Sequence, residues 1–299
     1  MAKTDKEKIE IELDNKEKAL AQAPVIVSAS RSTDIPAFYC DWFFHRLKVG
    51  YSAWTNPFNG VKMYVSYAKT RFIVFWSKNP RPLLEHIDEL KARGIGCYIQ
   101  YSLNDYEEEK LERGVPPLAE RIETFKKLVD VLGKGSVIWR FDPLVLTEDI
   151  TIEKLLNKIE NIGDQLKGYT EKLVFSFVDI LSYNKVKNNL KANGISFVDW
   201  TEEQMAEFAS RLVALNKEKG WNYKLATCGE KGRYPGVEPN HCIDDELIIK
   251  KSFHDKELMN YLKAEIKPMP PRDMFTNTIR LPEGAIILDS NHYATRGDN

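Results

Sequence analysis

The sequence predicts an α/β fold: a TIM-type (β/α) barrel, complete or incomplete, with a charged leader and an irregular C-terminal tail. Seven short apolar segments alternate with amphipathic helical segments, and an eighth strand is arguable near the C-terminus. Strict alternation of this kind indicates a parallel sheet with right-handed crossovers. About eight such units in 299 residues favour a barrel, and an open doubly wound sheet is the alternative.

The central strand is the segment from Ser136 to Pro143, which opens after glycine and ends in proline. Side chains alternate between the two faces of a strand. This alternation puts Val137, Trp139 and Phe141 on one face, and Ile138, Arg140 and Asp142 on the other. An arginine and a carboxylate at the carboxyl end of an apolar strand indicate a site, because α/β folds build their sites at that end.

The other elements follow from periodicity, caps and turn residues. We expect further strands at 25–30, 51–55, 71–76, 96–103, 172–178, 223–227 and 285–288. Helical spacing of apolar residues predicts helices at 37–48, 82–92, 118–132, 152–162, 201–215 and 244–262. Gly50 should close the first helix, and Thr201 with Gln204 has the spacing of a capping box.

Three regions are expected. Residues 1–23 form a charged leader, read as a frayed helix or tail outside the core, and residues 24–266 form the barrel domain. Residues 267–299 form a proline-rich C-terminal extension. Within the barrel domain, the long acidic loop 104–117 is a candidate lid.

Composition narrows the class of protein. A formal net charge of −1 gives no electrostatic case for a dedicated duplex-binding protein, although a local basic cleft stays open. No apolar run approaches the ~18 residues of a membrane span, and no signal-peptide core is seen. Four cysteines without close pairing suggest reduced thiols. These features predict a soluble cytoplasmic protein with no membrane partner.

Polar side chains gather at the predicted carboxyl ends of the strands. As catalytic candidates we assign Asp142, Asp179, Lys78 and Glu230. As substrate-binding candidates we assign Arg31, Asp34, Asn56, Asn79, Gln100, Arg140, Ser176, Thr227 and Cys228. The arginines would clamp a carboxylate or phosphate, and an aspartate would act as base or orienting group. The other interpretation is structural: these cations and carboxylates pair with one another and close the end of the fold. No metal ligand is assigned.

Several motifs in order resemble one known family. They are Ser28-Ala-Ser-Arg-Ser-Thr-Asp-Ile-Pro-Ala-Phe-Tyr39, Asn56-Pro-Phe-Asn59, Phe72-Ile-Val-Phe-Trp-Ser-Lys-Asn-Pro80, Val115-Pro-Pro-Leu118, Val137-Ile-Trp-Arg-Phe-Asp-Pro143 and Thr227-Cys-Gly-Glu230. Together they resemble the bacterial domain of unknown function 1848 family, from about Val25 to Asp245. Members commonly end in a cysteine cluster similar to the one that holds the [4Fe–4S] centre in radical S-adenosylmethionine enzymes. The resemblance thus implies a [4Fe–4S] cluster and S-adenosylmethionine for such relatives.

The tail of this sequence departs from that pattern, because residues 289–299 contain no cysteine. Either the chain is cut before the cluster or this member has lost it. A cluster needs about three neighbouring thiolates, and the four cysteines here are scattered, so we expect no cluster in this chain.

Three functional hypotheses follow. The first is an enzyme that binds a polar or anionic, small-molecule or nucleotide-like substrate at the carboxyl ends of the strands, with radical chemistry implied by resemblance for full-length relatives. The second is a metal-dependent hydrolase that uses the same carboxylates with His241. The third is a non-catalytic module that binds nucleic acid or a protein through the aromatic residues and the acidic loop.

Overall fold

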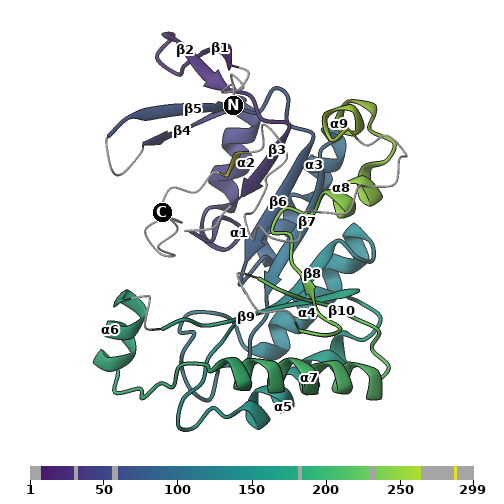
Figure 1. Ribbon diagram of the computed structural model, residues 1–299. Helices are drawn as coiled ribbons and strands as arrows, with labels where there is room; N and C mark the ends of the chain where they lie inside the picture. Colours follow the sequence, from purple (N-terminus) through teal and green to yellow (C-terminus); the bar gives the residue numbers. More distant parts are fainter. Residues whose placement is uncertain are drawn as a thin grey trace, which may run out of the picture. The chain divides into compact units, whose positions relative to one another are not determined.

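A computed structural model describes residues 8–29, 33–55, 60–180, 184–228, 234–263 and 286–287. The chain divides into two compact units. Unit 1 comprises Met1–Ile99 with Ile243–His292, and unit 2 comprises Gln100–Cys242 with Tyr293–Asn299. The boundary falls within strand β7 (Gly96–Ser102). Each unit is an α/β structure (Figure 1).

Unit 1 contains a four-stranded mixed sheet in the order β1-β2-β5-β4. Its strands are β1 (Lys8–Glu12), β2 (Lys18–Gln22), β4 (Tyr51–Thr55) and β5 (Lys62–Ser66). The prediction that the leader is a frayed helix or tail was wrong from Lys8 onward, because β1 and β2 form an antiparallel hairpin. Ile9 and Ile11 alternate with charged residues, and this period of two is that of a strand with one half-buried face.

The remaining elements of unit 1 surround parallel strands. β3 (Ile26–Ala29) pairs in parallel with β6 (Phe72–Ser77) and with β12 (Ile286–Ile287). The helices are α1 (Ile35–Phe38), α2 (Cys40–Val49), the 3₁₀ helix η1 (Arg81–Glu85), α3 (Ile87–Ala92), α8 (Asp245–Ser252) and α9 (Lys256–Tyr261). Gly50 ends α2 in the left-handed conformation, with φ of 97°, as the sequence predicts.

Unit 2 is built on parallel strands that continue from the end of β7. β8 (Val137–Leu144), β9 (Lys172–Phe177), β10 (Lys224–Thr227) and β11 (Glu238–Pro239) pair in parallel, each with the next. The helices are α4 (Leu118–Leu132), α5 (Ile152–Leu166), α6 (Asn184–Ala192) and α7 (Glu202–Glu218). α5 and α7 lie side by side (Figure 1). The capping box of Thr201 and Gln204 is present at the start of α7, as predicted.

One face of the unit 2 strands carries an aromatic core. Trp139 is fully buried. Its ring packs edge to face against the ring of Tyr223, with 6.0 Å between the two ring centroids. On β9, Phe175 and Phe177 both contact Phe208 of α7. Burial of this face stabilises unit 2, since aromatic side chains remove large apolar areas from water. The predicted burial of Trp139 is confirmed.

The predicted TIM-type barrel is wrong. The parallel strands follow the order β11-β10-β9-β8-β7-β6-β3-β12, and β11 and β12 are the two edges of this sheet rather than partners. The sheet is therefore open, as in the doubly wound sheet that was the alternative prediction from the sequence. Alternation of strands and helices sets parallel pairing, but it does not determine whether the first and last strands meet. The segment 51–55, counted as a barrel strand, lies in the antiparallel part of the smaller sheet as β4.

No helix in the described ranges is both long enough and apolar enough to cross a bilayer.

Candidate functional site

The carboxyl ends of the unit 2 strands bring together five of the predicted site residues. Gln100 comes from β7, Arg140 and Asp142 from β8, Ser176 from β9, and Cys228 directly follows β10. In the parallel register Arg140 pairs with Val174 and Val174 with Ala226, so residues two further along each strand share this face. We call these five residues, together with Cys242, the Arg140 cluster.

Arg140 is the centre of the cluster and is only 1% exposed. Its Nε and Nη2 donate to Asp142 Oδ2 at 3.2 and 2.5 Å, and Nη1 donates to Gln100 Oε1 at 3.3 Å. Nη2 also donates to Cys228 Sγ at 3.3 Å. The guanidinium is thus shared between a carboxylate and a thiol, and its hydrogen-bonding capacity is used largely inside the protein.

Asp142 is held from several sides. Ser176 Oγ donates a short hydrogen bond to Asp142 Oδ1. The backbone N–H of Asp142 donates to Asn104 Oδ1 at 2.8 Å, and Asn104 Nδ2 donates to the Asp142 carbonyl at 3.1 Å. β8 has an irregular register with β9 between Phe141 and Leu144, so this side-chain amide supports the strand where regular pairing is interrupted.

Two thiols lie beside the arginine. Cys228 Sγ and Cys242 Sγ are 3.8 Å apart, and Asn240 Nδ2 donates to Cys228 Sγ at 3.0 Å. The hydrogen bond with Cys242 and the positive charge of Arg140 lower the pKa of Cys228 well below its ordinary value, against the effects of burial and of Asp142. The cluster therefore favours a thiolate at Cys228.

Other predicted residues lie elsewhere. Thr227 pairs in register with Phe175, so its side chain is on the aromatic face rather than in the Arg140 cluster. Asp179 follows β9 and is exposed. In unit 1, Asp34 caps α1 through Ala37 N and accepts from Ser77 Oγ and the Lys78 backbone N–H, both at 2.7 Å. Its contacts are those of a structural residue.

The backbone N–H of Asn79 donates to Ser77 Oγ at 2.9 Å, so Lys78 and Asn79 sit in this tied turn after β6. Arg31, Asn56 and Glu230 lie outside the described residues.

Sequence reasoning missed Asn104, Asn240 and Cys242 as parts of the site. Asn104 follows the segment 96–103 directly, so the pattern that singled out the other strand ends could have found it. Asn240 and Cys242 carry no such signal, because they follow β11, a two-residue strand of low apolar content. Their place beside Cys228 comes from the parallel pairing of β10 with β11.

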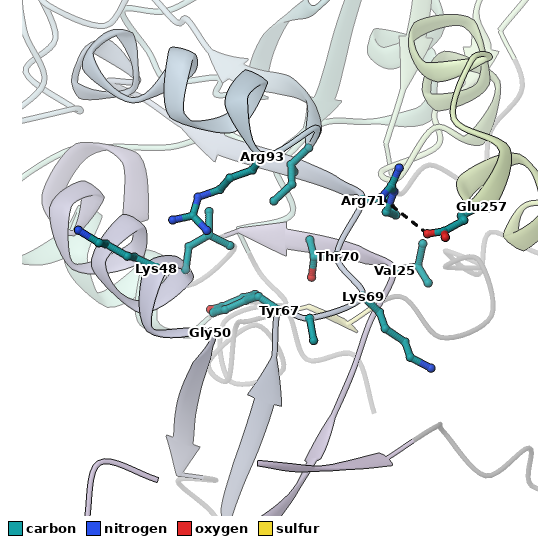
Figure 2. Close-up of a pocket in the computed structure, with 12 residues that line it drawn as sticks. Val25, Lys48, Gly50, Tyr67, Lys69, Thr70, Arg71, Arg93 and Glu257 are labelled. Carbon is teal, nitrogen blue, oxygen red and sulfur yellow. Dashed lines mark ion pairs between the residues drawn. The ribbon is translucent and has the colours of Figure 1, made fainter. Parts of the chain in front are cut away.

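A separate hollow of about 740 Å³ lies in unit 1 (Figure 2). Val25, Thr70, Arg71 and Ile95 line it just before β3, β6 and β7 begin. Arg71 there pairs with Glu257, the ion pair drawn in Figure 2. The hollow is thus at the amino ends of these strands, and no predicted site residue lines it.

Among the described side chains, no three His, Cys, Asp or Glu residues gather as a metal site would require.

The fold and the Arg140 cluster define an α/β protein with a buried arginine–thiol site at the carboxyl ends of parallel strands. A family model, the domain of unknown function DUF1848, matches residues 26–270, and the chain belongs to this family. The resemblance drawn from the motifs is confirmed. The match brings no activity with it, and it does not support the iron–sulfur or radical chemistry that the resemblance implied. No curated protein matches the chain.

Proposed function

We propose that this protein is an enzyme that uses the Cys228 thiolate as its nucleophile, on a polar substrate at the carboxyl ends of the unit 2 strands. The observation that carries the proposal is the 3.3 Å contact between Arg140 Nη2 and Cys228 Sγ. A buried guanidinium beside a thiol stabilises the thiolate, which is the reactive form of cysteine.

The surrounding contacts give each residue a role. Asp142 orients the guanidinium through two hydrogen bonds, and Ser176 orients Asp142 in turn. Gln100 accepts a hydrogen bond from Arg140, and Asn240 donates one to Cys228. These two bonds hold the guanidinium and the thiol in place. Positioning of this kind lowers the cost of organising the nucleophile before reaction.

The sequence predicts a polar or anionic substrate, and the same contacts favour a neutral, electrophilic one over an anion. Arg140 carries one positive charge, while Asp142 and the Cys228 thiolate carry one negative charge each. The cluster as a whole is therefore not cationic, and its arginine already binds two anionic groups. A buried arginine that is paired in this way is a poor clamp for a further carboxylate or phosphate.

The pH dependence of Cys228 alkylation tests this proposal. Iodoacetamide is a suitable neutral probe, with modification followed in the tryptic peptide Leu225–Lys231. We expect the rate to rise with a midpoint well below the ~8.5 of an ordinary thiol. Cys40 is an internal control, since burial raises the pKa of its thiol to about 12. A midpoint at or above the ordinary value for Cys228 would overturn the proposal.

Two variants change the midpoint in opposite directions. Arg140→Gln removes the stabilising charge and should raise it, provided that circular dichroism shows an intact fold. Asp142→Asn removes the carboxylate that raises the pKa of Cys228, so it should lower the midpoint further. Asp142→Asn retains a side chain of the same shape and leaves Arg140 beside the Cys228 thiolate, and circular dichroism checks its fold in the same way. An unchanged midpoint in folded Asp142→Asn would contradict the electrostatic argument.

A further inference from the structure

We propose that Cys228 and Cys242 form a dithiol centre that exchanges with small-molecule disulfides, with Cys228 as the attacking thiol and Cys242 as the resolving thiol. This inference goes beyond the proposed nucleophile, because it gives a role to the second cysteine. It rests first on the 3.8 Å between the two sulfur atoms.

The backbone holds the two cysteines as neighbours. Cys228 follows β10 and Cys242 lies shortly after β11, its parallel partner. The ladder extends past β11, because Asn240 N donates to the Thr227 carbonyl at 2.8 Å. Gln100 Nε2 donates to the Cys242 carbonyl at 3.3 Å and fixes the second cysteine from β7. The sulfurs need to approach by less than about 2 Å to reach covalent distance.

The two thiols have different surroundings. Arg140 and Asn240 both donate to Cys228 Sγ, and these two hydrogen bonds stabilise negative charge on that sulfur. Cys242 Sγ lies 3.8 Å from that sulfur, so the second thiol is the neighbour that can resolve a mixed disulfide at Cys228. Each of the two cysteine residues is about 5% exposed.

The exchange balances without any group that the protein lacks. The Cys228 thiolate attacks one sulfur of a disulfide RSSR, forms a mixed disulfide and releases RS⁻. The Cys242 thiol gives its proton to the released thiolate, attacks Cys228 Sγ as a thiolate and expels the second RS⁻, which takes up a proton from solvent. The protein dithiol is oxidised by two electrons, and RSSR is reduced to two RSH.

The other two cysteines provide a contrast. Cys40 and Cys97 both have pKa values raised to about 12 by burial, so they are poor nucleophiles at neutral pH. A variant with Cys40→Ala and Cys97→Ala therefore keeps the proposed centre and removes competing thiols. It is the matched control.

The test is equilibration of the full chain in buffers of reduced and oxidised glutathione, followed by acid quenching, alkylation and peptide mass spectrometry. We expect a disulfide between the peptides Leu225–Lys231 and Tyr234–Lys250 to grow as the fraction of oxidised glutathione rises. The Cys40→Ala, Cys97→Ala control should give the same curve. Cys242→Ser should instead accumulate glutathione on Cys228, at least tenfold above the wild type.

Two results would overturn the inference. One is a wild type in which the linked peptide stays absent in fully oxidised glutathione. The other is a linkage that forms only after the protein has been unfolded in denaturant. Failure here is distinct from failure of the proposed nucleophile: a low alkylation midpoint without the linked peptide leaves Cys228 as nucleophile alone. If the linked peptide forms but the alkylation midpoint of Cys228 is that of an ordinary thiol, the dithiol centre stands and the proposal of an activated thiolate fails.

Discussion

Arg140 shows how one buried residue serves two anionic partners. Nη2 contacts both Asp142 Oδ2 and Cys228 Sγ, so the carboxylate and the thiol compete for the same charge. The sequence left two interpretations of Arg140: a clamp for a ligand, or a structural partner of a carboxylate. The contacts favour a partner role, and they add the thiol that neither interpretation included.

The ionisation of Cys228 should appear in the pH dependence of stability. Its pKa is lowered in the folded state, so its contribution to the free energy of unfolding is fully present above the unfolded pKa of ~8.5. That contribution is lost as the pH falls through the folded pKa. The stability difference between wild type and Cys228→Ser should therefore grow as the pH rises from 5 to 9, as measured by urea unfolding.

Cys40→Ser is the control for this experiment. The Cys40 pKa is raised to about 12, so its thiol stays protonated in the folded state throughout that range. Its difference from the wild type should be flat up to about pH 8 and then change in the opposite direction. A flat profile for Cys228→Ser as well would contradict the assigned thiolate.

At the scale of elements, the acidic loop 104–117 is fixed to unit 2 by buried contacts. Glu109 and Lys158 pair at 3.3 Å with side chains that are 9% and 8% exposed. Tyr106 is buried as well and donates to the Pro143 carbonyl at 2.8 Å. These contacts are those of a loop that supports the end of β8, and opening it as a lid would require breaking them.

Glu109→Gln should therefore destabilise the protein by about 3 kcal/mol, because it leaves the buried Lys158 ammonium poorly compensated. Hydrogen exchange should show faster exchange across 104–117. Glu108→Gln is the matched control: Glu108 pairs with Lys154 at 3.3 Å but its side chain is 75% exposed. Its loss should cost at most about 0.5 kcal/mol. Equal effects of the two changes would show that the loop is not held by Glu109.

At the scale of the whole chain, unit 1 is closed by residues that are far apart in sequence. Asp255 Oδ2 accepts from Arg71 Nε at 2.8 Å across 184 positions, and Asp255 Oδ1 caps α9 by accepting from Leu258 N at 3.0 Å. α8 and α9 thus belong with the strands at the beginning of the chain. This arrangement explains why a unit of the structure is not a continuous segment of sequence.

Asp255→Ala should cost about 2 kcal/mol, because it removes a helix cap and the buried carboxylate of an ion pair whose arginine is partly exposed. The loss should appear as faster hydrogen exchange in β6 and α9, while β8 and β9 of unit 2 change little. Glu257→Ala is the comparison, since Glu257 pairs with Arg71 at 3.6 Å but is 79% exposed. Its effect should be below about 0.5 kcal/mol. Equal acceleration in β8 would contradict this assignment.

The sequence by itself determined most of the helices and strands and one face of the site. Alternation along 136–143 separated Trp139 from Arg140. The sequence also placed Gln100, Ser176 and Cys228 near strand ends, and the structure brings these three residues to Arg140 and Asp142. These features depend on local periodicity, caps and turns, which neighbouring residues set between themselves.

Only the tertiary structure decided which edges stay open and which residues meet across them. The sheet does not close between β11 and β12, the leader pairs as a hairpin, and Cys242 lies beside Cys228 through the short strand β11. Strand partners are chosen by pairing between distant segments, and several pairings are compatible with the same local pattern. For the same reason the sequence could not show whether Arg140 is available to bind an anionic ligand. That depends on Asp142 and Cys228, which the fold places against its guanidinium.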